Sequence, residues 1–187
     1  VALRAAGAPL EGLPEDDWTA FNLAPADGIA LLERWRAWSA ASSPSERLRW
    51  RERIDRERVE SLGLSAFFER HPTLSPPLVF APSTAHYSWS KGVKMLGIGR
   101  DRLRLIPGRA MRLDIDALSE ALDDCVRTRR PVLMAVGVFG STEFGTIDPL
   151  DALADLRERM RARGLGFALH ADAAWGGYLC TLFRSED

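Results

Sequence analysis

Short apolar runs alternate with longer stretches of helical spacing along residues 78–172. The apolar runs predict strands, which lie at Leu78–Ala81, Arg102–Ile106, Val132–Phe139 and Gly166–Leu169, the last running on to Asp172. Helices are predicted between them, at Tyr87–Leu96, from Asp114 or Asp116 to about Arg127, and from Pro149 to about Arg163 with Asp148 as its N-cap. This alternation predicts the α/β class, with a mostly parallel sheet flanked by helices.

Residues 1–77 show a different pattern. The prolines and glycines of residues 1–25 predict irregular structure, and Leu31, Trp35 and Trp38 share one face of a helix predicted over 27–41. Ser43, followed by Pro44 and Glu46, predicts the capped start of another helix. Acids and arginines nearly balance over 47–60, which favours a solvated helix face over a nucleic-acid patch. The chain therefore divides into a helical part, residues 1–77, and an α/β part, residues 78–187.

Composition narrows the function classes. The 187 residues are 46% hydrophobic, which is enough for a real core, and the net charge of −1 gives no reason to expect nucleic acid or an anionic membrane surface. No run of about 18 apolar residues predicts a membrane span. Cys125 and Cys180 lack C-x-x-C spacing, so a reduced, cytoplasmic setting is the simpler interpretation.

The richest candidate chemistry follows the last predicted strand. That strand runs into Asp172, and Ala173, Ala174, Trp175 and two glycines come next. Ligands of open α/β sheets bind just outside the carboxyl ends of the strands. We expect Asp172 to meet the positive end of a bound cofactor, and the small residues to leave room for a flat ring against the backbone.

Three segments together resemble one enzyme family. They are Leu169–Gly177, with the order His-Ala-Asp-Ala-Ala-Trp; Ala85–Lys91, with His-Tyr-Ser, continued by Met95–Gly99; and Phe139–Leu150, with Gly-Ser-Thr-Glu-Phe-Gly-Thr-Ile-Asp-Pro. Their sequence and order resemble the group II pyridoxal-phosphate decarboxylases over roughly residues 78–180. The resemblance implies the large domain of a fold-type I enzyme. Family members are more than twice this long, so we expect the chain, which begins at Val1, to be a fragment.

The resemblance also implies site roles. Asp172 would bind the ring nitrogen of pyridoxal 5'-phosphate and, by favouring its charged form, raise that nitrogen's pKa. His86 would stack on the ring opposite Ala174, and Thr142 would hydrogen-bond the ring substituents; His86 and Asp172 are the predicted catalytic residues. Taken alone, Asp172 and His86 would more often be a loop cap and a helix cap, and Thr142 could be an ordinary turn residue. His170 either supports Asp172 or is simply packed.

The implied reaction is α-decarboxylation of a small-molecule L-amino acid to an amine and carbon dioxide, by a homodimer with its active site at the interface. The segment 143–149 favours the tyrosine/aspartate decarboxylase branch. Two alternatives stay open: a carbon–carbon lyase of the same fold, similar to sphingosine-phosphate lyase, and a non-catalytic homologue acting as a scaffold or binding subunit. No metal is expected.

Two parts of the family pattern are missing. No Asp-x-His-Lys segment follows Asp172, and the only lysines, Lys91 and Lys94, lie in the helix predicted after His86. The fragment alone is therefore expected to be inactive. The phosphate-binding Ser-Gly-Gly turn is also absent, and the segment predicted at its place, 21–28, lacks the hydroxyls and the double glycine.

Overall fold

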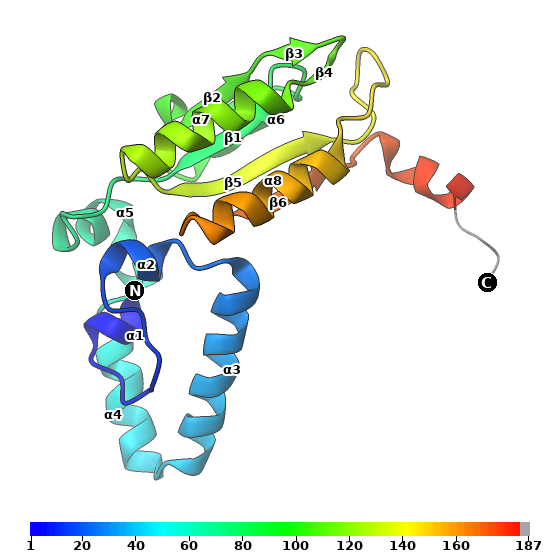
Figure 1. The fold of residues 1–187 in the computed structure, drawn as a ribbon. Helices are drawn as coiled ribbons and strands as arrows, with labels where there is room; N and C mark the ends of the chain where they lie inside the picture. The colour runs from blue at the N-terminus through cyan, green and yellow to red at the C-terminus, as the bar shows by residue number, and fades with distance from the viewer. Residues whose placement is uncertain (184–187) are drawn as a thin grey trace.

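The computed structural model describes residues 1–183 as a helical N-terminal part followed by an α/β part (Figure 1). The N-terminal part contains α1 (Ala2–Ala5), α2 (Asp17–Phe21), α3 (Pro25–Ala41), α4 (Pro44–Asp55) and α5 (Val59–Arg70). The α/β part contains β1 (Leu78–Pro82), α6 (Ser88–Met95), the 3-10 turn η1 (Arg100–Arg102), β2 (Leu103–Ile106), β3 (Gly108–Arg109), β4 (Arg112–Leu113), α7 (Ile115–Arg127), β5 (Val132–Val138), α8 (Leu150–Ala162), β6 (Ala168–Asp172) and the 3-10 helix η2 (Gly176–Phe183). The strands and long helices predicted for residues 78–172 are confirmed to within about two residues at each end.

The main sheet has four parallel strands in the order β2-β1-β5-β6. Their register places Val138 opposite Asp172 at the carboxyl ends of β5 and β6. A separate two-stranded hairpin, β3–β4, lies at the same end of the molecule as the carboxyl edge (Figure 1). The α/β class with a parallel sheet and flanking helices is therefore confirmed.

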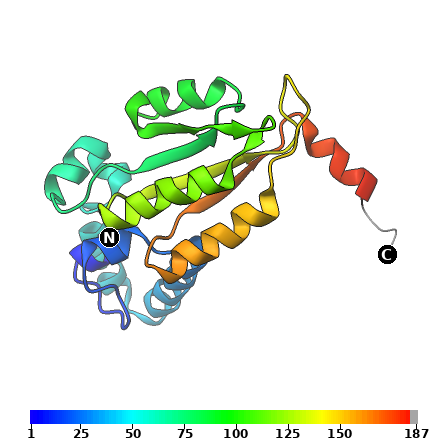
Figure 2. The same ribbon diagram turned by 45° about the horizontal axis from the view of Figure 1, so that its top comes forward.

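Helices lie on both faces of the sheet. Figure 2 shows α7 and α8 on one side and α6 on the other. The main apolar core forms under α7 and α8, where Leu118, Leu122, Leu153 and Leu156 are at most 1% exposed. Gly137 of β5 permits this close packing, because a Cβ there would lie 2.4 Å from the Leu150 side chain of α8.

Two predicted caps are confirmed and one is wrong. Asp114 caps α7 by accepting from the amides of Asp116 and Ala117 at 3.0 and 3.2 Å, and Ser43 forms a capping box with Glu46. Asp148 does not cap α8. Its buried carboxylate instead accepts from the amides of Leu113 and Val138, each at 2.7 Å, and so fastens the β3–β4 hairpin to β5.

The N-terminal part projects from the sheet as a helical hairpin of α3 and α4 (Figure 1). The tryptophan face predicted for α3 is confirmed: Trp35 stacks on Trp38 with ring centroids 5.0 Å apart, and Trp50 of α4 meets Trp38 edge-on at 6.2 Å. The charged stretch 47–60 lies in α4, which has no buried residue, in the following turn and in the first two residues of α5.

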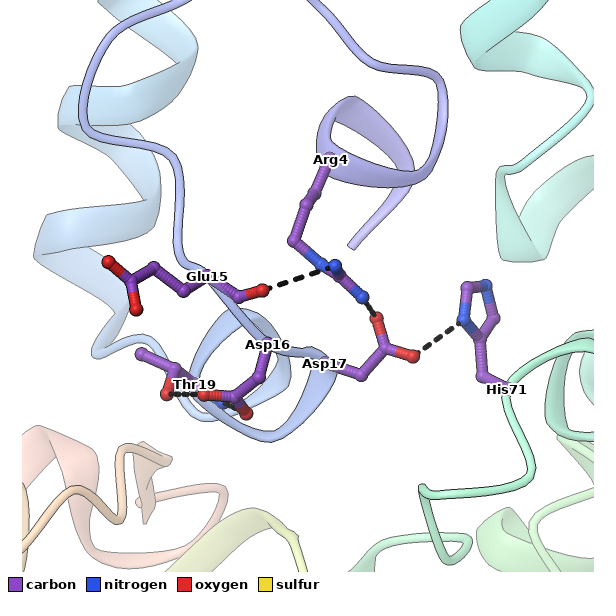
Figure 3. Close-up of polar contacts among 6 residues, drawn as sticks. All are labelled: Arg4, Glu15, Asp16, Asp17, Thr19 and His71. Atoms are coloured by element: carbon purple, nitrogen blue, oxygen red, sulfur yellow. Dashed lines mark hydrogen bonds and ion pairs between the residues drawn. The ribbon is translucent and has the colours of Figure 1, made fainter.

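Residues 1–25 contain two short helices where irregular structure was predicted. A polar cluster holds them, as Figure 3 shows: Asp17 of α2 pairs with Arg4, and its other oxygen lies 3.0 Å from Nδ1 of the buried His71. Burial works to raise the pKa of Asp17, but the hydrogen bonds from Arg4 and His71 outweigh it and lower that pKa. The contact between Asp17 and His71 spans 54 positions, so a local pattern could not reveal it. None of the helices within residues 1–183 is long and apolar enough to cross a membrane.

Candidate functional site

The strand order creates a crevice at the carboxyl edge of the sheet. After β1 the chain turns to α6 on one face, and after the neighbouring β5 it turns to α8 on the other face. Adjacent loops that leave in opposite directions open a crevice between them, which is the usual ligand position in open α/β sheets. The topology therefore predicts a ligand position at the edge of the sheet that contains Asp172.

One cavity of about 180 Å³ occupies this crevice. Its lining comes from the segments after β1, β5 and β6, and consists of Thr84, His86, Ser88, Val138, Gly140, Thr142, Asp172, Ala174 and Trp175. The four residues predicted from three separate segments, His86, Thr142, Asp172 and Ala174, are all in that set. The first and last of them, His86 and Ala174, are 88 positions apart in sequence, and the parallel sheet brings them together.

Asp172 ends β6 with its carboxylate at the cavity. Oδ2 accepts from the indole N–H of Trp89 at 2.9 Å, and Oδ1 lies 3.4 Å from the amide N of Ala174. One oxygen therefore has a strong neutral donor, whereas the other has only a long contact. That second oxygen retains acceptor capacity for a cationic group in the cavity.

His86 lies in the turn before α6, exposed to solvent. Its Nδ1 accepts from the amide of Ser88 at 3.3 Å, and its ring centroid is 4.0 Å from that of Tyr87. The imidazole is thus held beside the cavity by short-range contacts. Its stacking on a cofactor ring opposite Ala174 stays a prediction.

Thr142 lies on a loop that its neighbours stabilise. The hydroxyl of the buried Ser141 contacts that of Thr146 at 2.8 Å, and Thr146 donates to the carbonyl of Met111 at 2.7 Å. The Ser141 hydroxyl therefore forms its hydrogen bond within the loop. The exposed Thr142 is the hydroxyl residue of this loop that lines the cavity.

His170 contacts Trp89 rather than Asp172. No hydrogen bond within residues 1–183 joins the His170 and Asp172 side chains. The exposed imidazole instead meets the Trp89 ring edge-on, with centroids 5.2 Å apart, and Trp89 donates to Asp172. Both alternatives left open by the sequence, support of Asp172 and simple packing, therefore stay predictions.

The loops after β5 and β6 meet backbone to backbone at two glycines. The amide of Gly176 donates to the carbonyl of Phe139 at 3.1 Å, and a Cβ on Gly176 would lie 2.2 Å from that oxygen. A Cβ on Gly140, where φ is +83°, would lie 2.6 Å from Cα of Gly176. The space at Gly176 is therefore filled by Phe139, and the prediction that this glycine leaves room for a ring is wrong.

Comparison with known proteins identifies the family. The model for "Pyridoxal-dependent decarboxylase conserved domain" matches residues 65–187, about two thirds of the chain. The chain belongs to the pyridoxal-dependent decarboxylases.

Individual relatives agree with this family. The chain is 42% identical over 107 residues to the L-tyrosine decarboxylase of Levilactobacillus brevis, covering 57% of the chain and 17% of the relative. It is 39% identical over 102 residues to a probable L-aspartate decarboxylase of Haloarcula marismortui, covering 54% and 25%. The crystal structure of mouse CSAD is similar, with 30% identity and a TM-score of 0.52 over 60% of the chain and 25% of that structure. The chain thus spans between a sixth and a quarter of these relatives' length.

One residue that lines the cavity has a buried polar atom without a partner in the described part of the chain. The Thr84 hydroxyl is buried and has no hydrogen-bond partner within residues 1–183. A buried hydroxyl without a partner costs on the order of 1–3 kcal/mol. This lining would suit a ring ligand with oxygen substituents, because it combines a hydroxyl at Thr84, apolar groups at Val138 and Ala174, and a carboxylate at Asp172.

Sequence reasoning missed Thr84 and Trp89. Thr84 stands two residues before His86, so a search of the segment around that histidine for hydroxyls could have found it. Trp89 had no such signal, because its partner Asp172 is 83 positions away.

The two lysines of the chain lie outside the cavity. Neither Lys91 nor Lys94 lines it; both are exposed on α6, and Nζ of Lys91 lies 4.5 Å from the centroid of the Tyr87 ring. Lysine for covalent attachment of the cofactor is therefore not supplied by the described residues.

The segment 21–28 is at the wrong end of the sheet for phosphate binding. The carbonyl of Asn22 accepts from the amide of Gly166 at 2.9 Å, and Gly166 precedes β6. Asp172 ends that strand, six residues and roughly 20 Å farther along. The expectation that this segment replaces the phosphate turn is wrong.

A larger hollow of about 1280 Å³ lies elsewhere, between α5 and the end of α6. Its lining is mostly apolar and includes none of the predicted site residues. Within residues 1–183 no three His, Cys, Asp or Glu side chains are grouped to hold a metal ion.

Proposed function

We propose that these residues form part of the cofactor site of an enzyme that decarboxylates an L-amino acid to an amine and carbon dioxide. The observation that carries the proposal is the shared cavity: residues chosen from three separate motifs line one 180 Å³ space. Ligand pockets are usually about 300–1,000 Å³. The smaller volume is consistent with a site completed by other parts of the whole protein.

Pyridoxal phosphate, when bound, supplies an electron sink for the electron pair that carbon dioxide leaves behind. Asp172 is proposed to hold a proton on the ring nitrogen through its less occupied oxygen, Oδ1. His86 and Ala174 are proposed to flank the ring and fix its tilt. Thr142 and Thr84 are proposed to donate to its oxygen substituents.

The substrate class follows from the relatives. Proteins named for tyrosine and aspartate decarboxylation are similar to this chain at 39–42% identity, so we propose a member of that branch. The described residues supply no lysine at the cavity, and we infer that the 187-residue chain alone is inactive.

Assembly as a homodimer, with the site at the interface, is also part of the proposal. The helical hairpin supports it, because Ile29 and Leu32 of α3 and Leu48 of α4 are 49–58% exposed. A cytoplasmic location is proposed from the two free cysteines, of which Cys125 is buried and Cys180 exposed.

Replacing Asp172 by alanine in the full-length protein tests the assignment. Loss of a charge that stabilises the reacting centre lowers turnover on the order of 100- to 1,000-fold. Turnover is measured as carbon dioxide and amine released from L-tyrosine and L-aspartate, with Asp151→Ala, at an exposed position of α8, as the matched control. Near wild-type turnover in Asp172→Ala would reject the role. Release of an aldehyde without carbon dioxide from an amine that has a hydroxyl on the neighbouring carbon would indicate the carbon–carbon lyase. Cofactor binding with no product from any of these substrates would indicate the scaffold.

A further inference from the structure

Trp89 holds Asp172 from outside the cavity. Its indole N–H donates to Oδ2 at 2.9 Å, yet Trp89 itself is not among the residues that line the cavity. Trp89 instead lines a separate, mostly apolar hollow together with Val79, Val93 and Met134. A residue so placed reaches a ligand in the cavity only through Asp172.

The donor has one geometric effect. Fixing Oδ2 to the indole stops rotation of the carboxylate about its last bond and leaves Oδ1 for the ligand. The indole offers a single N–H and no acceptor, so it cannot compete for a proton on that ligand. Hydrogen bonds to charged groups contribute more than those between neutral groups.

The indole is itself held in place. Val93, one turn further along α6, is buried beside it, and the His170 ring meets its edge at 5.2 Å. Trp89 also follows His86 by three residues, so one short segment sets both the imidazole and the donor to Asp172. A shift of α6 would move the two together.

We propose that Trp89 is the positioning residue of Asp172, and that His170 keeps the indole in the donating orientation. The inference rests on the proposed function, because it assigns Trp89 a role through the carboxylate that meets the cofactor nitrogen.

The test is a double-mutant cycle in the full-length holoenzyme with Trp89→Phe and Asp172→Ala. Phenylalanine keeps the ring and removes only the N–H. Alone it should lower turnover roughly tenfold to hundredfold, the value of a hydrogen bond to a charged group, with little change in KM. In the Asp172→Ala background the same change should alter turnover and the pyridoxal-phosphate dissociation constant by less than about twofold, because the acceptor is gone.

A spectroscopic readout separates positioning from general damage. Absorption bands of the bound cofactor depend on the protonation of its ring nitrogen, so Trp89→Phe should change the band ratio at full occupancy. Trp35→Phe makes the same chemical change on α3 and should leave spectrum and turnover as in the wild type. His170→Leu, at an exposed position, should produce a smaller loss of roughly twofold to tenfold with the same dependence on Asp172.

Each outcome decides between the two proposals. If Asp172→Ala is impaired but Trp89→Phe behaves as wild type, or lowers both backgrounds by the same factor, the positioning role is wrong and the proposed function stands. If Asp172→Ala keeps wild-type turnover and spectrum, both are wrong. Both proposals are supported if Asp172→Ala and Trp89→Phe each lower turnover, if the effect of Trp89→Phe disappears in the Asp172→Ala background, and if Trp89→Phe changes the band ratio.

Discussion

The helical part and the α/β part of the chain use their apolar residues differently. In the α/β part, fourteen buried residues form one continuous cluster between the sheet and helices α7 and α8. In the hairpin, α3 has one buried residue, Leu31, over 17 positions, and α4 has none over 12. Helices gain most of their stability from packing an apolar face, and isolated ones of this length are marginal in water. The α/β part therefore has its own core, whereas the hairpin depends on contacts beyond itself.

This contrast also locates the candidate chemistry. Every residue that lines the cavity belongs to the α/β part, which has the packing to hold side chains in place. The hairpin contributes none of them. Its exposed apolar residues suit a role in assembly. Substitutions in the hairpin and in the α/β part should therefore affect different properties.

The two cysteines are expected to differ most, in their rates of alkylation. Cys125 is 2% exposed in α7, and burial raises its pKa to about 11, while Cys180 is exposed on η2. A thiol reacts as the thiolate, so at pH 8 under native conditions iodoacetamide should modify Cys180 at least about 1,000 times faster than Cys125. The rates are read by mass spectrometry of peptides over time, with Cys180→Ser as control. Similar rates would show that the α/β core opens freely.

Truncating a leucine in each part compares the two cores directly. Leu122 is fully buried in α7, and Leu122→Ala should lower the free energy of unfolding by about 2–5 kcal/mol. Leu48 on α4 is 58% exposed, and Leu48→Ala should stay within about 0.5 kcal/mol in the monomer. Urea unfolding followed by circular dichroism measures both. Equal losses would contradict the contrast, and a loss at Leu48 that appears only at high protein concentration would sharpen it into an assembly contact.

His86→Ala tests whether the loop after β1 takes part in the chemistry. Removing the stacking ring should lower turnover of the full-length protein on the order of 100-fold, the cost of a misplaced reacting group. Cofactor affinity should change much less, because the contact at Asp172 remains. Steady-state kinetics at saturating cofactor and an absorbance titration give the two values, and Trp35→Phe in the hairpin is the control. Weaker binding with unchanged turnover would exclude stacking as the role of His86.

The sequence by itself determined the α/β class, the order of strands and helices, the family and four residues of the candidate site. These rest on local signals: apolar runs, caps such as Ser43 and Asp114, and short motifs whose spacing is fixed along the chain. Such signals involve residues only a few positions apart, so they can be recognised in the sequence itself.

Only the tertiary structure decided the rest, because those features depend on partners far apart in sequence. The order β2-β1-β5-β6 placed the crevice between β1 and β5. Asp148 looked like a helix cap, yet Leu113, 35 positions earlier, supplies one of its two donors. Trp89 carried no signal in the sequence, because its partner Asp172 is 83 positions away. Segment 21–28 lies at the opposite end of β6 from that carboxylate. Burial and hydrogen bonding between distant segments fixed these roles, and no short stretch of sequence carries that information.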